Sequence, residues 1–168
     1  MSQATAATYK SPLHKMTQTT PTSLWNDSAS IEELKYSIEH GAVGATCNPV
    51  IVLGVLKKEM QAWKPRISAL IKELPTATED QIAWQLVREI SVQAARVLEP
   101  VFRAHNGKNG RLSIQTDPRL FRDSQAIFEQ AVAGIHGNYD SIRVSNCGGL
   151  NSRMGKLIFC ALSECHET

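Results

Sequence analysis

The sequence predicts an α/β fold with a parallel sheet. From Pro21 onward, short apolar segments typical of strands alternate with longer segments whose apolar residues recur at helical spacing. Capping residues and turn dipeptides such as Asn-Gly and Asp-Pro separate these segments. Because strands and helices that alternate in this way form βαβ units, the strands are expected to lie parallel and the helices to cover the sheet.

Length and composition are those of an ordinary globular domain. The chain has 168 residues, of which 42% are hydrophobic and 20% are charged, which is enough for one domain with its own core. A net charge of +2 without a Lys/Arg run argues against a nucleic-acid partner. No apolar run approaches a membrane span or a secretory signal. We therefore expect a cytoplasmic protein, with a polar flexible leader over residues 1–20 that also has some transit-peptide character.

The first strand, helix and second strand are expected between residues 22 and 46. Residues 22–26 and 42–46 are the two short apolar runs that indicate strands. Ser30 opens the helix between them, with Glu33 as its reciprocal capping-box partner. Gly41 supplies the helix stop.

Helical pattern dominates the middle of the chain. Asn48 is a good N-cap, and Pro49 follows at the first helical position. The pattern is expected to break at Pro65 and to resume as far as residue 74. Thr78 and Gln81 form a second capping box, which opens a long amphipathic helix that we expect Pro100 to kink.

Two further strands are expected in the rest of the chain. Residues 111–116 form one strand, which Asp117-Pro118 ends, and residues 123–137 form a helix. Residues 141–145 look like another strand.

The regular pattern ends after residue 144. Residues 145–168 have no clear period and contain three of the four cysteines. Cys160, Cys165 and His166 could be imagined as metal ligands, but the absence of a CxxC pair favours reduced thiols and no metal site. The predicted division is a leader over residues 1–20, an α/β unit over 21–144 and a divergent tail over 145–168.

Polar residues stand where the predicted strands end. Because parallel strands bring their carboxyl ends to one edge, this is where α/β folds place their chemistry. A carboxylate and two amides at one edge suit proton transfer and recognition of hydroxyl groups on a polyol. Taken singly, each has an ordinary explanation as a turn residue, a helix cap or a residue before proline. In chain order they are Asp27, Thr46, Asn48, Gln115, Asp117 and Ser145.

Three motifs at these positions resemble the transaldolase family in order and spacing. They read TSLWNDSAS, GATCNPVIV and GRLSIQTDPRL. The middle motif in that family is typically G-x-T-[ST]-N-P. The residues that match are Gly44, Thr46, Asn48 and Pro49. Cys47 replaces a hydroxyl residue, and Val50 replaces the Ser, Thr or Ala that usually follows the proline. The resemblance covers residues 21–144 and implies a (β/α)8 TIM barrel of the class I aldolase type, here an incomplete barrel of about four βα units.

The resemblance also implies an activity and a set of roles. Transaldolases transfer a dihydroxyacetone unit between sugar phosphates through a lysine Schiff base, in the pentose phosphate pathway and without a further cofactor. By position, Asp27 would be the acid/base residue, and Asn48 and Thr46 would hold the substrate. Gln115 stands where many relatives carry a glutamate that shuttles protons through a water. A glutamine can orient that water but cannot accept its proton.

The family's lysine is not where the resemblance would place it. In the family, the lysine lies in a motif like V-K-I-P-x-T. In this chain, Ser145 occupies the position of that lysine. Serine cannot form an imine with a carbonyl, and Lys156, the only later lysine, lacks the motif. We therefore expect a transaldolase-like chain that is catalytically impaired, as a truncation or a change of reading frame near residue 145 would produce.

Two other interpretations remain open. The chain could be a non-catalytic half-barrel that associates with itself or with a partner protein through exposed sheet edges. Alternatively, Cys47 could be a nucleophile, for which His40 would be the nearest candidate base in the sequence. If ligand binding survives, the expected ligand is a sugar phosphate.

Overall fold

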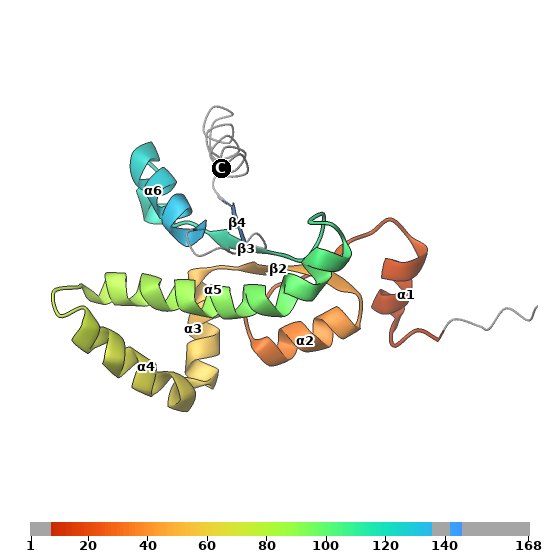
Figure 1. Ribbon diagram of the computed structural model, residues 1–168, viewed down its shortest axis with the longest axis horizontal. Coiled ribbons are helices and arrows are strands. Elements are labelled where there is room, and N and C mark those ends of the chain that lie inside the picture. The colour runs from red at the N-terminus through yellow and green to blue at the C-terminus, as the bar shows by residue number, and fades with distance from the viewer. Residues whose placement is uncertain (1–7, 136–141, 146–168) are drawn as a thin grey trace, which may run out of the picture.

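The chain folds around a four-stranded parallel sheet. The computed structural model describes residues 8–135 and 142–145 (Figure 1). The strands lie in the order β1-β2-β3-β4, so each strand neighbours the next one along the chain. Their bounds are β1 Leu24–Asn26, β2 Ala42–Cys47, β3 Arg111–Gln115 and β4 Ile142–Ser145. The predicted α/β class and its four parallel strands are confirmed, and within the described residues β1 and β4 are the two edges of an open sheet, not a closed barrel.

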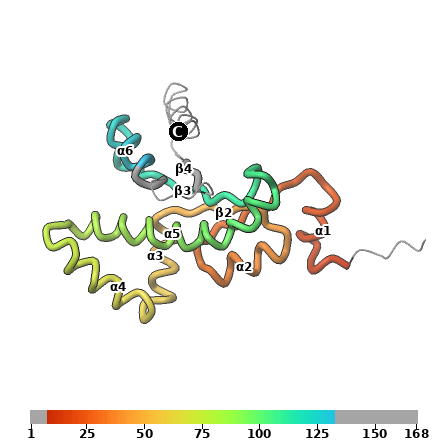
Figure 2. The backbone as a smooth tube through the Cα atoms, in the orientation of Figure 1, coloured from red at the N-terminus to blue at the C-terminus, as the bar shows by residue number. Residues whose placement is uncertain are grey.

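Helices connect every pair of neighbouring strands. The helix α2 joins β1 to β2, three helices precede β3, and a short 3-10 turn with α6 leads to β4. Figure 2 follows the chain from α3 through α4 into α5, which turns back along α4. No helix in the described part of the chain is long and apolar enough to cross a membrane. The helices are α1 Pro12–Thr19, α2 Ile31–Glu39, α3 Pro49–Lys58, α4 Met60–Glu73, α5 Glu79–Ala104, η1 Pro118–Leu120 and α6 Ser124–Ile135.

One face of the sheet packs against helices. Figure 1 shows α2, α3 and α5 on the same side of β2 and β3, and α5 contacts both strands. Ala45 and Leu112 are register partners with no exposed surface on this face, and Cys47 pairs with Ile114 one step further along. Because side chains alternate along a strand, Thr46 and its partner Ser113 point to the opposite face.

The first helix was not predicted. We expected a flexible leader over residues 1–20, but α1 occupies residues 12–19, with Ser11 accepting a hydrogen bond from the backbone of His14 as its N-cap. Gly41 adopts φ 92°, and a Cβ there would overlap the side chain of Thr17. The close approach of Thr17 therefore anchors α1 beside the residue that precedes β2.

The predicted helix ends are partly confirmed. The Thr78–Gln81 capping box is present in full. The box predicted at Ser30 is wrong, because the Ser30 side chain makes no capping bond and Glu33 is hydrogen-bonded to Ser28 instead.

The predicted position of the helix break needs correction. The break falls at Glu59, between α3 and α4, whereas Pro65 lies inside α4. The backbone of Glu59 is not helical, with φ −110° and ψ 22°. This one residue therefore separates the two helices. Pro65 removes only one hydrogen bond from the helix that contains it. Pro100 lies inside α5, and the kink expected there stays a prediction.

Candidate functional site

Asp27 and Thr46 meet at the carboxyl ends of β1 and β2. Asn26 pairs in register with Ala45, so the residues that follow them, Asp27 and Thr46, come side by side. The Thr46 hydroxyl donates a hydrogen bond to Oδ1 of Asp27. The Asp27 side chain is exposed, which leaves its second oxygen open to a ligand or a proton. The structure thus brings together two of the residues that the sequence pointed to.

Asn48 caps the helix that follows β2. Its Oδ1 accepts a hydrogen bond from the backbone nitrogen of Ile51 at 2.9 Å, and Pro49 occupies the first helical position, as predicted. The capping explanation for Asn48 is therefore correct for one of its two polar atoms. The amide Nδ2 is the group that could donate to a substrate hydroxyl, and that role stays a prediction.

The end of β3 lies on the same face of the sheet as Thr46. Thr46 pairs with Ser113, and Gln115 follows two residues later, so the alternation of the strand places Gln115 on the same face. Its register partner on β4 is Ser145. The backbone therefore places the position expected to hold the lysine directly across from Gln115.

Trp25 is a residue of this face that the sequence analysis missed. It pairs with Gly44 across β1 and β2, and a Cβ on Gly44 would lie 2.8 Å from Cδ2 and Cε2 of the indole. Only a glycine therefore fits under Trp25, just below the Asp27–Thr46 pair. A glycine in the middle of a strand often marks such a close approach, and Gly44 carried that signal.

Asp117 belongs to a structural cluster at the end of β3. Its side chain is only 8% exposed, and the Arg119 guanidinium lowers its pKa below the usual range, with a smaller contribution from a hydrogen bond to Trp84. Its Oδ1 also accepts from the backbone nitrogen of Arg119 at 2.9 Å, which caps η1. A carboxylate with this many donors is held as a fixed anion and is not free to act as an acid or base.

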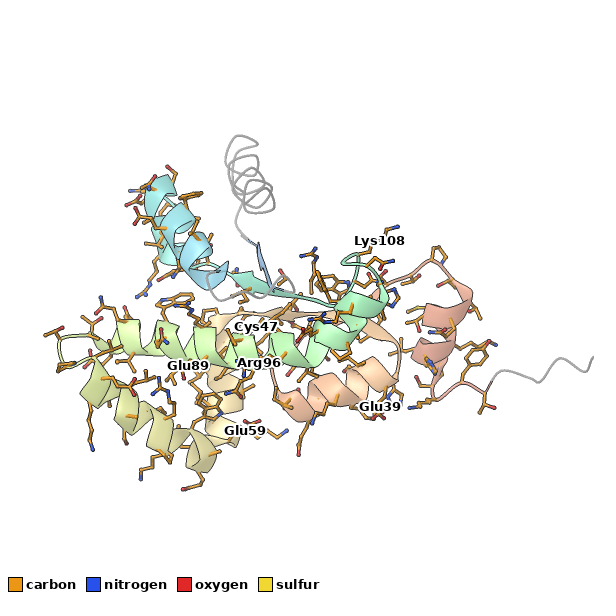
Figure 3. All side chains as sticks on the ribbon, in the orientation of Figure 1. Glu39, Cys47, Glu59, Glu89, Arg96 and Lys108 are labelled. Carbon is orange, nitrogen blue, oxygen red and sulfur yellow. The ribbon has the colours of Figure 1, made fainter. Side chains whose placement is uncertain are left out.

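Cys47 does not have the surroundings of a nucleophile. Its side chain lies on the helix-covered face, between β2 and α5 (Figure 3), and is 3% exposed. Burial raises the pKa of the thiol to about 11. Its sulfur lies 3.9 Å from the Asn48 carbonyl oxygen and 4.0 Å from Oγ of Ser91, and neither group is a base. His40 precedes β2, at the far end of the strand, and its Nδ1 lies against the Tyr36 carbonyl. The interpretation of Cys47 as a nucleophile is therefore not supported.

Some predicted residues fall outside the described part of the chain. They are Cys160, Cys165 and His166, discussed as metal ligands, and Lys156, discussed as a substitute lysine. Within residues 8–135 and 142–145, no three His, Cys, Asp or Glu side chains gather in a way that could hold a metal ion.

Comparisons with known proteins show which family this chain resembles. The model of the transaldolase/fructose-6-phosphate aldolase family matches residues 24–142. A transaldolase of Thermobifida fusca is 30% identical over 130 residues, which cover 73% of this chain and 34% of the relative. Transaldolase 2 of Streptomyces avermitilis is 33% identical over 90 residues, or 53% of this chain and 23% of the relative. The chain thus spans about a third or less of the length of these curated relatives.

Proposed function

Because the chain belongs to the transaldolase/fructose-6-phosphate aldolase family, we propose that it is a transaldolase-like protein that binds sugar phosphates but does not form a Schiff base. The proposed site is the carboxyl edge of β1, β2 and β3. The observation that carries the proposal is the hydrogen-bonded Asp27–Thr46 pair, which stands at this edge on the same face as Gln115.

Each residue of the proposed site has a chemical role that its atoms permit. The exposed carboxylate of Asp27 accepts hydrogen bonds from sugar hydroxyls and can take or give a proton. Thr46 holds that carboxylate in place through its hydroxyl. Asn48 offers its amide Nδ2 to a hydroxyl, while its Oδ1 stays on the helix cap. Gln115 orients a water or a hydroxyl and cannot serve as a base.

The covalent part of the family's reaction is proposed to be lost. A Schiff base needs an amine that attacks the ketose carbonyl and expels water, which serine cannot do. Ser145 stands across from Gln115 in the register of β3 and β4. We propose that a polypeptide of these 168 residues binds its sugar-phosphate ligand but does not transfer a dihydroxyacetone unit. It would then be a protein of a transferase family of carbohydrate metabolism whose catalysis is impaired.

The binding half of the proposal is tested by titration with fructose 6-phosphate. We expect saturable binding, which NMR detects as changes in the chemical shifts of the Asp27, Thr46 and Gln115 backbone amides. Asp27→Asn should weaken this binding, whereas Glu99→Gln, on the exposed flank of α5, should leave it unchanged. Binding that is equally strong in Asp27→Asn would contradict the assignment of the site.

A second candidate is a half-barrel that acts through self-association, with no catalysis. It is favoured by the open edges of the sheet at β1 and β4 within the described residues, because unpaired strand edges promote association. Light scattering tests it, since a discrete dimer supports self-association and a monomer across a hundredfold range of concentration contradicts it. A cytoplasmic location remains our expectation.

A further inference from the structure

Arg119 joins two carboxylates at the end of β3. Its Nε lies 3.0 Å from both carboxylate oxygens of Asp117, and its Nη2 donates to Oδ2 of the same residue at 2.7 Å. The remaining guanidinium nitrogen, Nη1, donates to Oδ2 of Asp80 at 2.7 Å. Every nitrogen of the guanidinium therefore contacts a carboxylate, and two negative charges face its one positive charge. This arrangement does not suit the capture of an anionic ligand.

The cluster ties three elements together. Asp80 lies in the first turn of α5, and Trp84, one turn later, is hydrogen-bonded to the Asp117 carboxylate. The backbone nitrogen of Asp117 donates to Oε1 of Gln130, on α6, at 2.6 Å. The segment just after β3 is thus held to α5 on one side and to α6 on the other.

We propose that Arg119 is a positioning residue that fixes the end of β3 and, with it, the side chain of Gln115. The inference rests on the proposed function, because Gln115 is assigned to the ligand site. Only one residue separates Gln115 from Asp117, so a shift of the Asp117 backbone is passed directly to Gln115. Ligand-binding groups have to be held to within about 0.5 Å to be effective.

The geometry requires an arginine at this position. The planar fork of a guanidinium can bind both oxygens of one carboxylate while its third nitrogen reaches another. A lysine carries the same charge on a single nitrogen and cannot hold both oxygens of Asp117 in this way. The bridge to Asp80 is exposed on both sides and contributes little on its own. The bond to the buried Asp117 is therefore the part that fixes the loop.

The test compares Arg119→Met and Arg119→Lys with the control Asp80→Asn. The main measurement is the NMR signal of the Gln115 side-chain amide without ligand, and the second is the affinity for fructose 6-phosphate. We expect both Arg119 variants to move the Gln115 signal and to weaken binding about tenfold. Asp80→Asn removes only the exposed bridge and should leave the signal and the affinity close to those of the wild type.

The outcomes separate this inference from the proposed function. A folded Arg119→Met with an unchanged Gln115 signal overturns the positioning role, whatever the ligand does. If the wild type does not bind fructose 6-phosphate, the proposed function fails, but the Gln115 signal still decides the positioning role. Should Arg119→Met not fold, Arg119→Lys keeps the positive charge and removes the fork that holds both oxygens of Asp117. An unchanged Gln115 signal in that variant would again overturn the inference.

Discussion

The hydroxyl of Thr46 donates a hydrogen bond to the carboxylate of Asp27, across the carboxyl ends of β2 and β1. The two residues are separated by a whole helix in the sequence, and the parallel register of the strands brings them together. Thr46→Val keeps the shape of the side chain and removes the donor. We expect binding of fructose 6-phosphate to weaken about tenfold, because Asp27 loses the bond that orients it. The free energy of unfolding, measured in urea, should fall by only about 1 kcal/mol. Unchanged affinity in the folded variant would contradict the role of this pair.

Gly44 should tolerate no side chain. Because an added Cβ would lie 2.8 Å from the Trp25 ring, Gly44→Ala should lower the free energy of unfolding by about 1–3 kcal/mol. The matched control is Gly54→Ala in α3, where an added Cβ meets nothing within 4 Å. That variant should stabilise the protein by about 0.5–1 kcal/mol. Denaturant unfolding measures both, and equal effects of the two substitutions would refute the contact between Trp25 and Gly44.

Asp117 should make stability depend on pH in the acid range. Its pKa in the folded chain is lowered, chiefly by Arg119, whereas an unfolded aspartate has a pKa of about 3.9. The stabilisation is therefore fully present above the unfolded pKa and is lost as pH falls through the folded pKa. The gap in unfolding free energy between wild type and Asp117→Asn should be large at neutral pH and shrink in strong acid. A gap that stays constant from neutral pH to strong acid would show that this carboxylate is not stabilised as an anion.

Cys47 should react slowly with iodoacetamide. Its thiol is buried, and its pKa is raised to about 11, so almost none of it is thiolate at neutral pH. We expect labelling of the folded chain to be at least about tenfold slower than that of a model thiol. Labelling in urea, compared with a Cys47→Ser variant, identifies the signal of this residue. Labelling of the folded chain as fast as the model thiol would restore Cys47 as a candidate nucleophile.

The strands and most of the helices could be predicted because their signals are local. The Thr78–Gln81 box and the Asn48-Pro49 start use only neighbouring residues, and both are present. The helix α1 was missed because its sequence is polar, although Ser11 and Pro12 carry the same local start signal as Asn48 and Pro49. The break at Glu59 was likewise hidden, because Pro65 was the stronger local signal.

The candidate site was predictable in its location and not in its contacts. The rule that parallel strands end at one edge pointed to Asp27 and Thr46, which do meet. The same rule could not show that Arg119 binds the Asp117 carboxylate, because it concerns where strands end and not which neighbouring side chains turn toward each other. Trp25 was missed because its role on the sheet face follows from register with Gly44, which only the structure supplies.

The most direct test of the central claim is the mass of the intact chain after borohydride treatment with fructose 6-phosphate. If this polypeptide binds its ligand without a Schiff base, the mass should stay unchanged, because Ser145 offers no amine. A Ser145→Lys variant, which restores an amine at that position, is the matched comparison for any adduct formed there. A mass increase of one reduced sugar adduct on the wild-type chain, at a single lysine, would contradict the account.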